Sequence, residues 1–168
     1  MSSFTIRRAR TPDVPGIREL VKPLADRRVL LEKEAVAYYE NLQEFLVAED
    51  SEGNLIGCGG LHVMWEDIAE VRTLATSEAW RGKGVGRVLL QRLIDEARDL
   101  GVDRVFCLTF EVGFFERNGF KAMAEQSAVD PEVYSELLRS TDEGVAEFLD
   151  LARVKPNTLG NTRMIISV

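Results

Sequence analysis

The stretch Arg81-Gly82-Lys83-Gly84-Val85-Gly86 is the most informative part of this 168-residue chain. It follows an apolar run that is typical of a strand, and it precedes leucines with helical spacing. Glycines let a backbone come close to a ligand, and the first turn of a helix offers N–H groups and the positive end of a dipole. The stretch therefore predicts a phosphate site at a helix start. A plain turn is the alternative.

The spacing of these glycines argues against two common nucleotide motifs. A Walker A loop ends in Lys-Ser or Lys-Thr, which is missing, and a Rossmann fingerprint lies in a βαβ unit rather than after a hairpin. Arg81, Lys83 and Arg87 add positive charge here to a chain whose net charge is −7. Such an acidic chain would repel a polyanion on average, so we expect no nucleic-acid partner.

The surrounding segments alternate between strand and helix patterns. Strands are expected at residues 4–8, 45–49, 55–64, 70–76, 105–110 and 164–168, and helices at about 14–21, 32–43, 87–100 and 114–117, with a further, largely helical segment at about 128–155. A turn cluster at residues 50–54 joins two strands into a hairpin. We expect a single α/β domain over residues 1–168, with a mixed, mostly antiparallel twisted sheet flanked by helices.

The composition is that of an ordinary globular protein, with 45% hydrophobic and 29% charged residues. The N-terminus has no apolar leader and no run is long enough to span a membrane, so we expect a cytoplasmic protein without a membrane partner. Cys58 and Cys107 lie in apolar runs and are expected to be buried thiols. Together with the lone His62 they do not make a ligand set, so we expect no metal.

Three blocks, in this order and at this spacing, resemble the GNAT superfamily of N-acetyltransferases. Residues 70–76 stand where the family's fourth strand stands, and Arg81-x-x-Gly84-x-Gly86 matches the family's Arg/Gln-x-x-Gly-x-Gly/Ala motif. The segment from Phe114 to Phe120 resembles its Phe-Tyr-x-x-x-Gly-Phe segment. The resemblance implies the GNAT fold, acetyl-CoA as co-substrate, and direct attack of an amine on the thioester without an acyl-enzyme.

The same resemblance assigns the cofactor to two stretches of backbone. It implies that Leu74 and Thr76 pair with the pantetheine arm, and that the amide of Leu74 or Ala75 stabilises the tetrahedral oxyanion. The pyrophosphate is expected on the loop and the helix start, with these residues around it: Arg81, Gly82, Lys83, Gly84, Val85, Gly86 and Arg87.

Glu70 matches the position of the general base in several members of the family. An α-ammonium group must lose a proton before it attacks, and a carboxylate acting directly or through one water would take that proton. The alternative is an exposed glutamate at a strand end that pairs with a nearby arginine. The family's usual tyrosine, which can protonate the leaving thiolate, is Phe115 here, so we name no general acid.

Shorter blocks narrow the resemblance to the acetyltransferase domain of bacterial N-acetylglutamate synthases, in their short, stand-alone form. They begin at Leu30, Phe45, Ile56, Phe106 and Gly160. These enzymes acetylate the α-amine of glutamate in the first step of arginine synthesis. The resemblance therefore implies a small-molecule amine, L-glutamate, as acceptor.

Matching positions supply candidate groups for the two carboxylates of glutamate. Lys33 stands near a family arginine, His62 on a family lysine and Thr162 on a family serine. Gly160 falls where the longer enzymes carry a carboxylate-binding arginine, and we consider Arg163 or Arg72 as its replacement. Taken singly, each of these residues also fits a solvated or ion-paired role.

The sequence is also compatible with other functions. The acceptor could be another small amine or an amino acid such as glutamine, or the chain could be an acetyl-CoA-binding module without catalysis. The extra segment at about 128–155 could cover the acceptor pocket, form the contact of a homodimer, or simply pack on the sheet.

Overall fold

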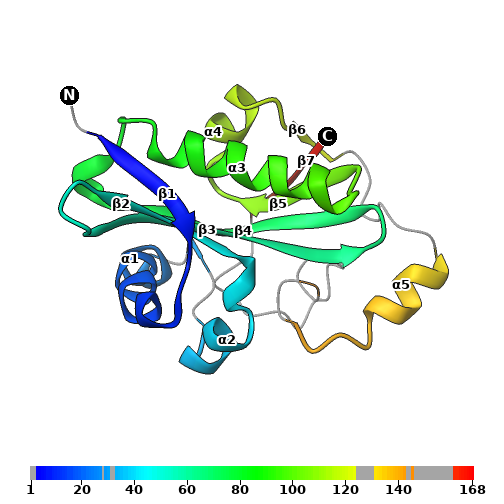
Figure 1. Ribbon diagram of the computed structural model, residues 1–168. Coiled ribbons are helices and arrows are strands. Elements are labelled where there is room, and N and C mark those ends of the chain that lie inside the picture. Colours follow the sequence, from blue (N-terminus) through cyan, green and yellow to red (C-terminus); the bar gives the residue numbers. More distant parts are fainter. Residues whose placement is uncertain (1–2, 28, 31–32, 124–130, 143–144, 146–160) are drawn as a thin grey trace.

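The computed structural model of the protein describes residues 3–27, 29–30, 33–123, 131–142, 145 and 161–168. Within them one sheet has the strand order β1-β2-β3-β4-β5-β7-β6 (Figure 1). Neighbouring strands are antiparallel except for the parallel pair β4 and β5. The strands are β1 (Phe4–Arg8), β2 (Phe45–Asp50), β3 (Leu55–Trp65), β4 (Ile68–Thr76), β5 (Arg104–Thr109), β6 (Lys121–Ala122) and β7 (Thr162–Ser167). The predicted α/β class and mostly antiparallel sheet are confirmed.

Helices cover both faces of this sheet. They are α1 (Val14–Asp26), α2 (Ala35–Glu40), α3 (Val85–Leu100), α4 (Val112–Arg117) and α5 (Pro131–Leu137), with 3-10 turns at Thr11–Asp13, Leu42–Glu44 and Glu78–Trp80. The core of one face contains residues of α3 and α4, and the cores of the other face contain residues of α1, α2 and α5 (Figure 1). On the first face, Gly57 lets α3 approach closely, because a Cβ there would lie 2.8 Å from Val85 Cγ1.

One helix prediction differs from the structure. The helix expected at residues 32–43 is wrong in extent: α2 is only six residues long, and a 3-10 turn follows it. Asn41 is its C-cap residue, and both its backbone N–H and its side-chain amide donate to the Ala37 carbonyl, at 3.1 Å and 3.0 Å. Within the segment expected at 128–155, the structure describes residues 131–142 and 145, and α5 lies at Pro131–Leu137.

The strands β4 and β5 pair over a short distance and then separate. Their register joins Ile68 to Arg104, Ala69 to Val105 and Glu70 to Phe106. Beyond Glu70, β4 continues to Thr76 and stays paired with β3. The sheet therefore opens into a wedge whose apex is at Glu70.

A bulge in β4 lies inside this wedge. Arg72 pairs with Gly60 and Ala75 pairs with Cys58, so Thr73 and Leu74 together oppose one residue of β3. Thr73 has a φ of 57°, which is unusual for a β-branched residue. Bulges shift the alternation of side chains along a strand. Here Leu74 packs on the α3 face, and Ala75 packs on the α1 face.

Candidate active site

A cleft of about 390 Å³ occupies the wedge between β4 and β5. One wall is β4 from Val71 to Thr76, and the other contains Cys107, Leu108 and Thr109 of β5. The start of α3 lies at the end where the strands are apart, because β4 leads into it through the glycine stretch. The lining thus joins three segments that are distant in the sequence.

Most of the predicted cofactor residues line this cleft. These are Leu74, Ala75, Thr76, Arg81, Gly82, Gly84, Val85, Gly86 and Arg87. Lys83 is not among the lining residues: its ammonium group lies 5.0 Å over the ring of Trp80, which does line the cleft. The sequence analysis missed Trp80, Phe114 and Arg117, which lie in the lining as well.

The glycine stretch forms the N-terminus of α3 through left-handed backbone. Gly82 has a φ of +75° and Gly84, the N-cap residue, a φ of +86°. A Cβ at either position would meet nothing within 4 Å, so glycine is needed there for conformation rather than for space. The first helical hydrogen bond runs from the Val88 N–H to the Gly84 carbonyl at 3.0 Å. The N–H groups that precede Val88 in the helix are therefore directed out of its N-terminus, where an anion is favoured.

A band of charged residues lies on the opposite side of β4 from α3. His62 pairs directly with Glu70 across β3 and β4, and Arg72 follows Glu70 on the same face. Apolar residues flank the band along both strands: Ile68 and Met64 at one end, and Ala75 and Cys58 at the other. Strand alternation thus concentrates these charges between two parts of the core.

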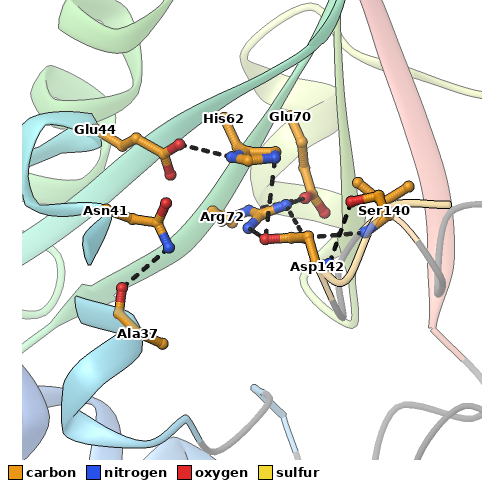
Figure 2. Close-up of polar contacts among 9 residues, drawn as sticks. Ala37, Asn41, Glu44, His62, Glu70, Arg72, Ser140 and Asp142 are labelled. Carbon is orange, nitrogen blue, oxygen red and sulfur yellow. Dashed lines mark hydrogen bonds and ion pairs between the residues drawn. The ribbon is translucent and has the colours of Figure 1, made fainter. Parts of the chain in front are cut away.

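Arg72 links two carboxylates in this band (Figure 2). Its Nε donates to Glu70 Oε1 at 2.9 Å, and its Nη1 and Nη2 donate to Asp142 Oδ2 and Oδ1, both at 2.8 Å. His62 lies beside this pair: Nδ1 is 2.6 Å from Glu44 Oε2, and Nε2 is 3.9 Å from Asp142 Oδ2. Residues of four separate segments therefore form one charged network.

Burial and charge act against each other on these groups. Burial alone would raise the pKa of Asp142, but the hydrogen bonds and charge of Arg72 outweigh it and hold that pKa well below its usual range. Burial likewise opposes the charge of Arg72, whereas Glu70 and Asp142 raise the pKa of its guanidinium. The pKa of Lys33 is lowered, first by burial and then by the positive charge of Arg72. The last observation places Lys33 within electrostatic reach of the network.

The structure brings some of the predicted acceptor residues together and separates others. Glu70, Arg72 and His62 are in one network, with Lys33 close by. Thr162 and Arg163 lie on β7, beyond β5, where they pair with Thr109 and Leu108 of the cleft wall. Gly160 lies outside the described residues.

Glu70 itself is neither exposed nor at a strand end. It is the third residue of β4 and is 4% exposed, so the alternative of an exposed strand-end glutamate is wrong, although an arginine does pair with it. Phe115 is buried between Phe114 and Phe120. The position of the family tyrosine is thus filled by an apolar ring within the core.

Sequence reasoning missed Glu44 and Asp142. Both are charged residues in irregular or 3-10 segments, and neither belongs to a recognisable motif. The one signal for Asp142 was the break in helical pattern around residues 140–142. A break of that kind predicts an irregular segment but not the side chain that it presents.

Other features bear on the remaining expectations. Cys58 and Cys107 are buried free thiols, as predicted, and burial raises the pKa of Cys58 to about 12. In the part of the chain that the structure describes, no group of three metal-binding side chains is placed around a common point. None of the described helices has the length and apolar character of a membrane span.

Two comparisons at the sequence level bear on the family. The acetyltransferase (GNAT) family model matches residues 15–120. The amino-acid acetyltransferase of Mycobacterium tuberculosis is 53% identical over 163 residues, which cover 96% of this chain and 92% of that protein.

Solved structures agree with this similarity. The crystal structure of Rv2747 from Mycobacterium tuberculosis, in complex with CoA and NLQ, has a TM-score of 0.93 at 52% identity and covers 98% of this chain and 99% of its own. The N-acetylglutamate synthase from Neisseria gonorrhoeae, complexed with coenzyme A and N-acetyl-glutamate, has a TM-score of 0.79 at 26% identity. The two structures match over 99% of this chain and over 35% of that longer protein. The chain therefore belongs to the GNAT family of acetyltransferases.

Proposed function

We propose that this chain transfers the acetyl group of acetyl-CoA to the α-amine of L-glutamate, the first step of arginine biosynthesis. The observation that carries the proposal is the wedge between β4 and β5, which has a helix N-terminus at its open end and Glu70 at its apex. A helix N-terminus that favours a phosphate group and a carboxylate that can take a proton from an amine thus lie at the two ends of one wedge, with Glu70 next to Val71 of the cleft lining.

The cofactor follows the open edge of β4 in this proposal. The N–H groups of Val85, Gly86 and Arg87 bind the pyrophosphate, with Arg81 beside them. The pantetheine arm runs along the backbone from Thr76 in the direction of Glu70, beside a stretch of β4 that is roughly 20 Å long at about 3.3 Å per residue. The thioester carbonyl lies next to Leu74 or Ala75, whose amides are our candidates for the oxyanion site.

The reaction needs one base and produces one thiolate. Glu70 takes a proton from the acceptor ammonium, and the free amine attacks the thioester carbonyl carbon. The attacking nitrogen of the tetrahedral intermediate loses its second proton to water, and the intermediate collapses by breaking the C–S bond, which leaves CoA as thiolate and the acetylated amine. Tyr38, Tyr39 and Tyr134 are not among the residues that line the cleft. We therefore assign protonation of the thiolate to no side chain.

Two relatives support an amino acid as acceptor: the amino-acid acetyltransferase of Mycobacterium tuberculosis and the N-acetylglutamate synthase of Neisseria gonorrhoeae. Lys33 and His62 on one side of the apex, and Thr162 and Arg163 on the other, are our candidate groups for its carboxylates. A cytoplasmic location and a homodimer remain predictions.

Glutamine is the second candidate acceptor, and one observation favours it. Arg72, which we considered as a ligand of an acceptor carboxylate, already binds two carboxylates of the protein itself. Fewer cations are then available for a second carboxylate on the acceptor, whereas a neutral side-chain amide does not need one.

Release of free CoA with each of the twenty amino acids as acceptor tests this proposal. We expect turnover with glutamate above the acceptor-free background. Turnover with glutamine or another amino acid instead would contradict the glutamate assignment and keep the enzyme class. Binding of acetyl-CoA without turnover on any acceptor would support a non-catalytic module.

A further inference from the structure

Asp142 comes to the charged network from outside the sheet. It lies after α5, and its side chain is held locally, because Asp142 Oδ1 accepts a hydrogen bond from the Val145 N–H at 3.1 Å. Its own N–H donates to Ser140 Oγ at 3.2 Å. The carboxylate that these contacts orient then forms two hydrogen bonds to Arg72 (Figure 2).

Asp142, as a third partner, changes the net charge of the Glu70–Arg72 ion pair. Two residues of opposite charge have no net charge, and they offer little attraction to a cation. With Asp142 the set of three carries a net charge of −1. The Arg72 side chain is 7% exposed and the Asp142 side chain 18% exposed, so this charge is only weakly screened by water.

Among the described residues, the titratable groups around this set come from several segments of the chain. His62 of β3 lies beside Asp142, and Glu44 holds the far side of the His62 ring. Lys33 carries a pKa lowered by burial first and by Arg72 next, and Cys107 of β5 is near enough to Glu70 to feel its charge. Glu44 pairs with His62, so the −1 charge of the Glu70–Arg72–Asp142 set is left facing Lys33.

We propose that Asp142 and Glu70, bridged by Arg72, bind the protonated amine of the acceptor before Glu70 takes its proton. This inference rests on the proposed function, in which Glu70 is the base. The geometry of the ion pair leaves room for that step, because both hydrogen bonds from Arg72 to Glu70 end on Oε1 and neither uses Oε2. An ammonium group has three N–H donors and can therefore contact both carboxylates at once.

The Asp142→Asn variant tests the proposal, because it removes the charge and keeps the shape. We expect the KM for the acceptor to rise about tenfold at pH 7, the effect of losing one charge-assisted contact. The difference from the wild type should shrink toward pH 10, where the acceptor amine is largely neutral, and the KM for acetyl-CoA should not change. Asp95→Asn is the matched control, because it breaks the exposed Asp95–Arg98 pair on α3 and should leave both KM values unchanged.

Two outcomes of this experiment overturn the proposal. An acceptor KM that is equal in variant and wild type at every pH shows that Asp142 does not contact the amine. A KM that falls in the variant shows that Asp142 competes with an acceptor carboxylate for Arg72. A purely structural role for Asp142 would change KM by the same factor at pH 7 and pH 10.

Binding to the wild-type protein gives a second test that needs no variant. With CoA bound, calorimetry should show glutamate binding at least about tenfold more tightly than glutarate, which has both carboxylates but no amine. Equal affinities would overturn the proposal even if Asp142→Asn fails to fold. If a different amino acid is acetylated, the glutamate assignment fails separately, and the comparison is made between that amino acid and its deaminated analogue.

Discussion

At the residue scale, Glu70 combines three properties that are rarely found together. It is buried, it is bound to an arginine, and it lies where two strands separate. A buried carboxylate is costly unless it is paired, and Arg72 provides the partner. Arg72 therefore holds the carboxylate in place where the two strands separate.

The Glu70→Gln variant should lower kcat about a hundredfold or more at neutral pH, the usual contribution of a general base. The loss should become smaller at high pH, where the acceptor amine has already lost its proton. Steady-state rates from pH 6 to pH 10 measure this, with Glu116→Gln on the exposed side of α4 as control. A loss that is constant over the whole pH range would remove Glu70 as base.

Asp142 predicts a pH dependence of stability with a definite sign. Its pKa is depressed in the folded protein, so the ionised carboxylate favours the native state. That contribution is complete above about pH 4, the ordinary pKa of aspartate, and is lost as the pH falls further. Urea unfolding should show Asp142→Asn less stable than wild type by about 1–3 kcal/mol at pH 7. The gap should narrow at pH 3; an unchanged gap would contradict the assignment.

At the element scale, two glycines of the α3 N-terminus have different reasons to be glycine. Gly84 has a positive φ and open space around it, whereas a Cβ on Gly86 would lie 3.5 Å from both Phe114 Cζ and Thr76 Oγ1, two residues of the cleft. The first position is limited by backbone conformation. At the second, a larger side chain would enter the cleft between β4 and β5.

Substitutions at these two positions should therefore separate stability from cofactor binding. Gly86→Leu should raise the KM for acetyl-CoA about tenfold or more, because the side chain takes space from the cofactor. Gly84→Ala should mainly lower stability, by about 1–3 kcal/mol, because alanine is strained at a positive φ. Saturation kinetics and thermal unfolding of both variants measure the two effects. Equal effects of both substitutions on KM would show that the distinction is wrong.

The sequence predicted the elements far better than the contacts between them. Alternating apolar runs predicted the strands, and leucine spacing predicted α3, because both patterns reflect burial against the sheet. Most of the residues that the family resemblance assigned to the cofactor line the cleft between β4 and β5. No such pattern could predict Asp142, since its contact with Arg72 spans 70 positions of the chain and depends on how an irregular segment returns to the sheet.

At the scale of the whole molecule, the β5 side of the sheet is joined to the β4 side over three residue pairs. A ligand in the wedge would contact both walls and the start of α3. Such a ligand binds the native state and not the unfolded chain, so it stabilises the whole domain by mass action.

Thermal unfolding with CoA measures this effect. At a CoA concentration of about 100 times its Kd, the native state gains about 2.7 kcal/mol, which corresponds to a rise in Tm of roughly 5–10 °C for a domain of this size. Gly86→Leu should show a much smaller rise at the same concentration. A wild-type protein whose Tm does not respond to CoA would contradict the assignment of the cleft.

The bulge in β4 has a consequence for how this chain tolerates deletions. Thr73 is the extra residue, and Arg72 and Leu74 on either side of it already face opposite sides of the sheet. A gene lacking only codon 73 would therefore encode a strand with ordinary alternation and no side chain on the wrong face. The core would keep its composition, while the backbone would follow a shorter path past the wedge. The number of residues in β4 would thus alter the shape of the cleft wall, without any change in the residue types that pack on the two faces of the sheet.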